Sequence, residues 1–182
     1  MPRLTAVIPV RNSLPELRPC LASIIGAANS FGGCQVIVVD NGSNDGSAEF
    51  ITGTYGNLVK LVNLPDANIG MVRNEGARQT DTDYIAFIDS DCVVPEAHFF
   101  RAAQLLNEDE SLAAVGCKVG LPDNPGWIES TWHKLHFPTQ DRNPDYLNSG
   151  NLIVRRSAFE QVGGFSSDLI TGEDAELGQK LR

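Results

Sequence analysis

Two carboxylates separated by one residue follow an apolar run in the segment IDSDC, from Ile88 to Cys92. Asp89 and Asp91 offer hard oxygen ligands of the kind that Mg²⁺ and Mn²⁺ prefer, and such a pair leaves coordination positions open for water and phosphate oxygens. A diphosphate is the natural partner of a metal held in this way. The pattern alone is weak, since Asp is common in turns, but its place directly after a buried strand makes it more specific.

Loop residues with binding groups also follow two other apolar runs. They are Pro9, Arg11 and Asn12 after the first run, and Asp40 and Asn41 after the second. Ligands of an open parallel sheet bind outside the carboxyl ends of its strands, where the loops diverge. A lone Asp after a strand is most simply a turn or cap residue. Three such strand ends together favour a binding site.

Apolar, β-branched runs alternate with helical patterns along the chain. We expect strands at 4–10, 35–40, 59–64, 84–89, 112–119 and 152–155, and helices at 14–28, from Ser47, and at 69–79, 95–106, 127–135, 158–162 and 173–181. Ser13 and Glu16 have the spacing of a capping box at the start of the first helix. The alternation predicts an α/β fold with a mostly parallel central sheet and helices on both faces.

The composition fits one globular domain with a packed core. The 182 residues are 42% hydrophobic and 20% charged, and a formal net charge of −9 is the wrong sign for sequence-independent nucleic-acid binding, so we expect no nucleic-acid partner. No stretch approaches the roughly 18 apolar residues that span a bilayer. The cysteines show no CxxC spacing, which indicates free thiols in a reducing compartment; they are Cys20, Cys34, Cys92 and Cys117.

Six segments occur in an order that is hard to assign to chance. They are VIPVRN at 7–12, VVDNGSNDGS at 38–47, NIGMVRNEGA at 68–77, FIDSDC at 87–92, NSGNLIVRRSAFEQVGGF at 148–165 and GEDAEL at 172–177. With these segments the chain resembles the family 2 glycosyltransferases of the GT-A fold, which are inverting and use nucleotide sugars. The resemblance runs from Leu4 to the C-terminus.

The resemblance implies roles for the donor-side residues. Asp40 is expected to hold the base of a uridine nucleotide, with Pro9, Val10 and Arg11 around base and ribose. A UDP-sugar is therefore the expected donor.

The third segment implies further donor contacts. Arg73 is expected near the donor diphosphate or base, supported by Asn68 and Gly70.

The last two roles concern the chemistry itself. The resemblance implies that Asp89 and Ser90 lie on the nucleotide, and that Asp89 and Asp91 hold a divalent cation, Mn²⁺ or Mg²⁺. It makes Asp174 the general base, with Glu173 beside it. A carboxylate at this place is otherwise explained as a helix N-terminal residue stabilised by the macrodipole.

The extent of the resemblance also predicts a domain organisation. We expect a single domain over 1–182, with the donor half at 1–119 and an incomplete acceptor half at 120–182, because family members continue past the ED segment. The expected acceptor is a glycan, a lipid-linked molecule or a protein, in cell-envelope polysaccharide synthesis. The expected location is the cytoplasm, or the inner face of the membrane through parts absent from this chain.

Two other functions stay open. A nucleotide-sugar binding module without turnover would share the donor site. A sugar-phosphate nucleotidyltransferase has a similar sheet, but its first strand is normally followed by a glycine-rich phosphate loop, whereas here PVRNSLPEL contains no glycine. A Rossmann dehydrogenase is disfavoured because no GxGxxG follows any expected strand.

Overall fold

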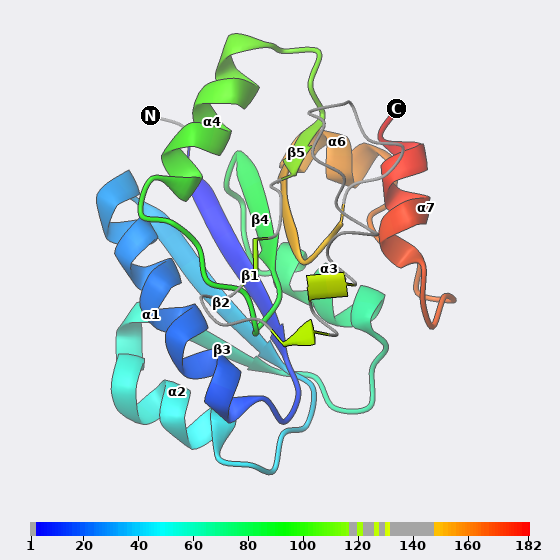
Figure 1. The fold of residues 1–182 in the computed structure, drawn as a ribbon. Coiled ribbons are helices and arrows are strands. Elements are labelled where there is room, and N and C mark those ends of the chain that lie inside the picture. Colours follow the sequence, from blue (N-terminus) through cyan, green and yellow to red (C-terminus); the bar gives the residue numbers. More distant parts are fainter. Residues whose placement is uncertain (1–2, 117–119, 122–125, 128–129, 132–147) are drawn as a thin grey trace.

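The computed structural model describes residues 3–116, 120–121, 126–127, 130–131 and 148–182. Within them, six strands form one sheet in the order β3-β2-β1-β4-β6-β5 (Figure 1). The strands are β1 (Leu4–Val10), β2 (Cys34–Asp40), β3 (Lys60–Asn63), β4 (Tyr84–Ile88), β5 (Ala114–Gly116) and β6 (Asn151–Arg155). The first four are parallel, and β6 runs antiparallel to both of its neighbours. The expected mostly parallel sheet is confirmed.

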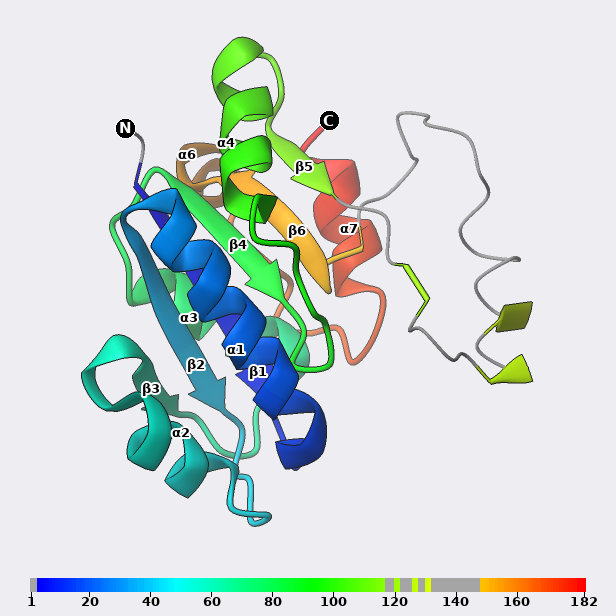
Figure 2. The ribbon, with the colours of Figure 1, turned by 60° about the vertical axis from the view of Figure 1, so that its left-hand side comes forward.

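Helices cover both faces of this sheet, as expected. They are α1 (Leu14–Phe31), α2 (Ser47–Tyr55) with the 3₁₀ turn η1 (Gly56–Leu58), α3 (Ile69–Arg78), α4 (His98–Glu108), α6 (Arg156–Gln161) and α7 (Glu173–Lys180). Two apolar clusters place α1, α2 and α4 on one face and α3, α6 and α7 on the other (Figures 1 and 2). The sheet is therefore the middle of three layers.

Alternation along β1 explains why that strand is almost entirely apolar. Leu4, Ala6 and Ile8 belong to the cluster under α1 and α4, whereas Val7 belongs to the cluster under α3. Successive side chains of a strand point to opposite faces, so a central strand covered on both sides needs apolar residues at every position. The sequence LTAVIPV satisfies this requirement except at Thr5, whose buried hydroxyl lies 2.9 Å from that of Thr82, and all of its residues are buried.

The start of α1 differs from the expectation. Ser13 is the N-cap, but its side chain caps no backbone group. Its hydroxyl instead lies 2.9 Å from the hydroxyl of Ser90, while the backbone N–H of Leu14 donates to Oδ2 of Asp45 at 2.8 Å. The capping box expected from Ser13 and Glu16 is therefore wrong, because a carboxylate from a distant loop reaches the first turn.

The same carboxylate also holds the start of α2. Oδ1 of Asp45 accepts hydrogen bonds from the backbone N–H and the hydroxyl of Ser47, at 3.1 and 2.6 Å. These bonds hold the pKa of Asp45 below its ordinary value, the Ser47 hydroxyl contributing most and the Leu14 N–H next. One side chain thus fixes the N-termini of two helices relative to each other.

Several expected boundaries shift. The helix expected from residue 95 begins at His98, after a turn in which the His98 N–H donates to the Pro95 carbonyl at 3.0 Å. The expected strand at 112–119 is confirmed only at 114–116, and its residues 117–119, Cys117 and most of the expected helix at 127–135 lie outside the described residues. The three described cysteines are free thiols. In the described ranges, no helix has both the length and the apolar character needed to cross a membrane.

Candidate functional site

A cleft of about 490 Å³ lies beyond the carboxyl ends of β1 and β4. In the sheet, β2 and β3 lie on one side of β1, and β4 lies on its other side. The strand order therefore reverses at β1, and ligands of an open α/β sheet bind at such a switch point. Seven residues expected at the donor site line the cleft: Pro9, Val10, Arg11, Arg73, Asp89, Ser90 and Asp91. Its other lining residues are Ser13, Glu16, Asn41, Ile69 and Val72.

Arg73 is the buried centre of the site. Its guanidinium donates through Nη2 to Oδ1 of Asp89 and through Nη1 to Oε1 of Glu173, each at 2.7 Å, and its side chain is only 4% exposed. The guanidinium also lies 5.4 Å from the centre of the Phe165 ring. Two carboxylates share one guanidinium, so the cluster keeps one net negative charge. Sequence reasoning placed Glu173 only beside the expected base and missed this contact.

Gly150 makes room for the Asp89 carboxylate. A Cβ at this position would lie 2.6 Å from Oδ2 of Asp89 and 3.0 Å from Oδ1 of Asn148. The backbone of Gly150 also accepts from the Asp89 N–H at 3.0 Å and donates to Oδ1 of Asn148 at 2.7 Å. The segment NSG therefore packs directly behind Asp89, and a side chain at position 150 would force the Asp89 carboxylate to move.

Asp91 is the exposed carboxylate of the DxD segment. Its Oδ1 accepts a long contact of 3.7 Å from the Cys92 thiol. Burial raises the pKa of the Cys92 thiol to about 12, and the charges of Asp91 and Asp89 add to that rise. The carboxylates of Asp91 and Asp89 both line the cleft, and their oxygens fit a divalent cation whose coordination water and diphosphate would complete. Among the described residues there is no group of three or more side chains that could hold a metal by themselves.

Asp40 lies at the end of β2 but does not line the cleft. It is 4% exposed, and its Oδ1 accepts from the backbone N–H and the hydroxyl of Ser43, at 3.0 and 2.5 Å. Its neighbour Asn41 does line the cleft, and it exchanges two hydrogen bonds with the backbone of Ala67, at 2.8 and 3.1 Å. The loop after β2 is thus held rigidly beside the site.

Asn68 and Gly70 act on the packing of α3 rather than on the cleft surface. Oδ1 of Asn68 caps α3 by accepting from the Met71 N–H at 2.9 Å, while its Nδ2 donates to the carbonyl of Ser167 at 2.5 Å. A Cβ on Gly70 would lie 2.6 Å from the carbonyl oxygen of Ser166. Both residues let the segment before α7 lie directly against α3, and α3 carries Arg73.

Asn74 strengthens the same contact and was missed by sequence reasoning. Its Nδ2 donates to the Phe165 carbonyl at 2.8 Å, and its Oδ1 accepts from the Phe165 N–H at 3.0 Å. The ring of Phe165 packs edge-on against Phe87 of β4, with centroids 5.0 Å apart. The only available signal was that Asn74 follows Arg73 within one of the segments that carry the resemblance.

Asp174 lies in the first turn of α7, where a carboxylate is also stabilised by the helix macrodipole. The helix begins after Gly172, whose φ is 81°, and Oδ1 of Asp174 accepts from the Ala175 N–H at 2.8 Å. Asp174 is partly buried and does not line the described cleft. The residue of the ED pair that reaches the site is Glu173, through Arg73.

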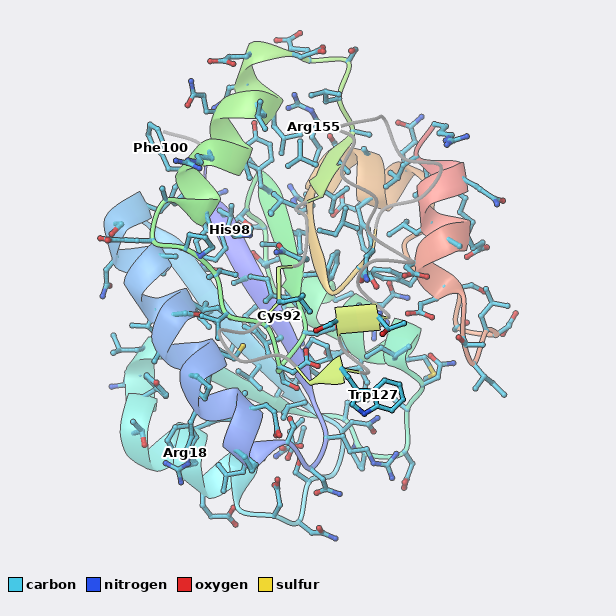
Figure 3. The ribbon with its side chains drawn as sticks, viewed as in Figure 1. Arg18, Cys92, His98, Phe100, Trp127 and Arg155 are labelled. Atoms are coloured by element: carbon cyan, nitrogen blue, oxygen red, sulfur yellow. The ribbon has the colours of Figure 1, made fainter. Side chains whose placement is uncertain are left out.

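Another basic side chain lies away from the cleft. Arg155 pairs in register with Tyr84 at the amino end of β4, and its Nε donates to the Leu112 carbonyl at 2.8 Å. Figure 3 shows Arg155 between α4 and β5, far from Cys92 next to the DxD segment. Its Nη2 also donates to the carbonyl of Leu106 in α4, so Arg155 joins the end of α4 to the sheet and does not line the cleft.

Several known proteins are similar to this chain over most of its length. Residues 5–163 match the family described as Glycosyl transferase family 2. Glycosyltransferase AglE of Haloferax volcanii is 26% identical over 96% of this chain and 59% of its own length. The pre-mycofactocin glycosyltransferase of Mycobacterium tuberculosis is 29% identical over 98% of this chain and 38% of its own length. The chain thus spans well under two thirds of the length of these relatives.

Solved structures share the fold. The mannosyltransferase PcManGT from Pyrobaculum calidifontis, in complex with GDP-Man and Mn²⁺, superposes with a TM-score of 0.78 at 22% identity, over 99% of this chain and 52% of that one. S. aureus TarS 1–349, in complex with UDP-GlcNAc, gives 0.78 at 20% identity, over 98% of this chain and 53% of that one. The expected GT-A fold is confirmed.

Proposed function

The chain belongs to glycosyl transferase family 2, and from that premise we propose that its cleft binds a nucleotide sugar and that the sugar passes to an acceptor hydroxyl with inversion. The observation that carries this proposal is the convergence of Arg73, Asp89, Ser90 and Asp91 at the switch point of the sheet. Acidic and basic groups meet there around a space large enough for a nucleoside diphosphate.

The proposed donor is a UDP-sugar. Asp40 would hold the base from the end of β2, with Pro9, Val10 and Arg11 of the cleft wall around base and ribose. Two solved relatives were captured with UDP-GlcNAc and with GDP-Man, which supports a nucleoside diphosphate sugar and leaves the base to experiment.

Asp91 and Asp89 would hold a divalent cation. When bound, such a cation offsets the charge that develops on the leaving diphosphate. Asp91 suits this role because its carboxylate is exposed at the cleft and free of ion pairs within the described residues, whereas Oδ1 of Asp89 is already held by Arg73. The Mn²⁺ bound in the PcManGT complex supports the presence of a divalent cation.

Asp174 is the proposed general base. A single displacement needs a carboxylate that takes the proton of the attacking hydroxyl on the face of the sugar opposite to the leaving group. Asp174 adjoins Glu173, which the site holds through Arg73.

We assign 1–119 to the donor half and 120–182 to part of the acceptor half. The proposed acceptor is a glycan, lipid-linked or protein hydroxyl in envelope polysaccharide synthesis.

Calorimetric titration tests the donor site. UDP, GDP and dTDP are added with and without Mn²⁺ to the unaltered chain, to Asp91→Ala and to the control Asp81→Ala, whose exposed carboxylate pairs with Arg3 at the opposite end of β4. We expect metal-dependent binding that favours UDP, is lost in Asp91→Ala and is kept in Asp81→Ala. A folded protein that binds none of the three at millimolar concentration would refute the donor site.

Turnover separates an enzyme from a binding module. Release of UDP from UDP-sugars is measured for the unaltered chain and for Asp174→Asn. We expect release to fall at least about 100-fold in the variant while UDP affinity is unchanged, because a general base contributes 10²- to 10⁴-fold. Equal release by both proteins would remove Asp174 from the mechanism.

A further inference from the structure

The ion pairs of Arg73 join parts of the chain that are otherwise far apart. Asp89 directly follows β4, sixteen residues after Arg73, whereas Glu173 is the first residue of α7, 100 residues after Arg73. Both contacts are 2.7 Å long, and the guanidinium between them is almost completely buried. The side chains of Arg73 and Glu173 are only 4% and 10% exposed, so their charges interact strongly, whereas the Asp89 side chain is 38% exposed and open to a ligand in the cleft. A change in the charge balance at Asp89 must therefore be felt at Glu173.

We propose that Glu173 is a positioning residue: through Arg73 it couples the binding of a nucleoside diphosphate at Asp89 to the fixing of the first turn of α7, which carries Asp174. This inference rests on the proposed function and deepens it. It concerns how the donor end of the cleft and the proposed base become organised together.

The direction of the coupling follows from the sharing of one cation by two carboxylates. Without a ligand, Arg73 divides its charge between Asp89 and Glu173. A cation or a ribose hydroxyl that binds Asp89 offsets part of the negative charge that Asp89 presents to Arg73. The guanidinium then interacts more strongly with Glu173. The start of α7 is held more tightly as a result. By reciprocity, holding α7 raises the affinity for the nucleotide by the same factor.

The surroundings of α7 make the ion pair its polar anchor. The segment that leads to α7 is held against α3 at its beginning, where Asn74 binds both backbone groups of Phe165 and Asn68 reaches Ser167. Exposed residues follow in that segment, including Ile170 at 88% exposure. The helix itself then packs through Leu177, and its first turn is attached by Glu173.

Hydrogen exchange of the α7 backbone tests the coupling. The full chain is measured alone and with saturating UDP and Mn²⁺, as the unaltered protein, as Glu173→Gln and as Glu176→Gln. Glutamine at 173 keeps an oxygen opposite Arg73 but loses the charge, so the fold is expected to persist. Glu176 is the matched control, because it lies in the same turn and pairs with Lys180 instead, at 2.7 Å.

We expect UDP to slow exchange over residues 175–180 about fivefold or more in the unaltered chain and in Glu176→Gln. In Glu173→Gln this response should disappear, and UDP affinity should fall by a similar factor. A purely structural role for Glu173 would raise exchange equally with and without UDP and leave the response intact, which would overturn the proposal.

The remaining outcomes separate the two levels of inference. Binding of UDP without any response at α7 in the unaltered chain would refute the coupling alone. Failure of UDP, GDP and dTDP to bind to the folded chain would refute the proposed function, and the coupling with it.

Discussion

Replacing Gly150 by alanine should disturb the site through one identifiable side chain. The new methyl would lie 2.6 Å from Oδ2 of Asp89, so the carboxylate must retreat by at least about 0.8 Å to reach the 3.4 Å at which ordinary contact begins. Its other oxygen is fixed at 2.7 Å from Arg73. A shift of this size weakens the hydrogen bond to the guanidinium, because that bond is already at its optimal length.

The magnitude follows from two opposing effects. Hydrogen bonds to charged groups contribute about 1.5–3 kcal/mol. Alanine restricts the unfolded chain more than glycine does, which returns about 0.4–1 kcal/mol where the backbone accepts alanine, and the φ angle of Gly150 is not among the positive ones. The free energy of unfolding should therefore fall by about 1–2 kcal/mol, and Mn²⁺-dependent UDP binding should weaken with it.

A double-mutant cycle in urea isolates the cause. Unfolding is measured for the unaltered chain, Gly150→Ala, Asp89→Ala and the double variant. With Asp89 truncated the methyl meets no carboxylate and only the 3.0 Å contact with Oδ1 of Asn148 remains, so the loss caused by Gly150→Ala should shrink to near zero. An equal loss in both backgrounds, or no loss in the unaltered background, would show that Asp89 is not what the glycine accommodates.

Gly76→Ala should lower the free energy of unfolding by about 1–3 kcal/mol, because its Cβ would lie 2.2 Å from a buried valine of β1. Gly26→Ala, in open space on α1, should instead raise the free energy of unfolding by up to about 1 kcal/mol. Urea titrations that rank the two variants otherwise would contradict the packing of α3. Asp45→Ala removes the shared helix cap. Because the folded pKa of Asp45 lies below its ordinary value, the deficit in Tm should be complete near pH 7 and shrink as pH falls through about 4 and below, and a constant deficit would refute the assignment. Burial raises the pKa of the Cys20 and Cys92 thiols to about 12. Near pH 8, iodoacetamide should therefore label both at least about 100-fold more slowly in the folded chain than in urea. Mass spectrometry measures this labelling, and rapid labelling of the folded protein would contradict the prediction.

Local patterns were sufficient to predict the layers of this fold. Apolar runs such as LTAVIPV specify strands buried on both faces, and Asp89 and Asp91 after such a run are necessarily at the carboxyl edge of the sheet. The cleft at that edge could therefore be anticipated from residue order alone. The functions of all the expected site residues remain predictions. Four of them do not line the described cleft: Asp40, Asn68, Gly70 and Asp174.

Long-range partners could not be predicted from the pattern. Arg73 lies on the buried side of a helix and therefore required an acidic partner, but the chain contains 23 acidic residues and no spacing selects Glu173. The failed capping box has the same origin. Glu16 had the correct local spacing, yet Asp45 reached the N–H of Leu14 from a loop that only the folded chain brings near.

Because Arg73 and Glu173 are 100 residues apart, their contact forms late during synthesis of the chain. The parallel strands β3, β2, β1 and β4 are complete once Ile88 has left the ribosome, whereas Glu173 emerges about 4–17 s later at ordinary translation rates. Until Phe159 and Phe165 arrive, the side of Phe87 that they cover is exposed to solvent or to chaperones. Translation thus produces the four parallel strands early and the contact between Arg73 and Glu173 late, and a ribosome that stalls between these points holds a nascent chain with an exposed apolar face.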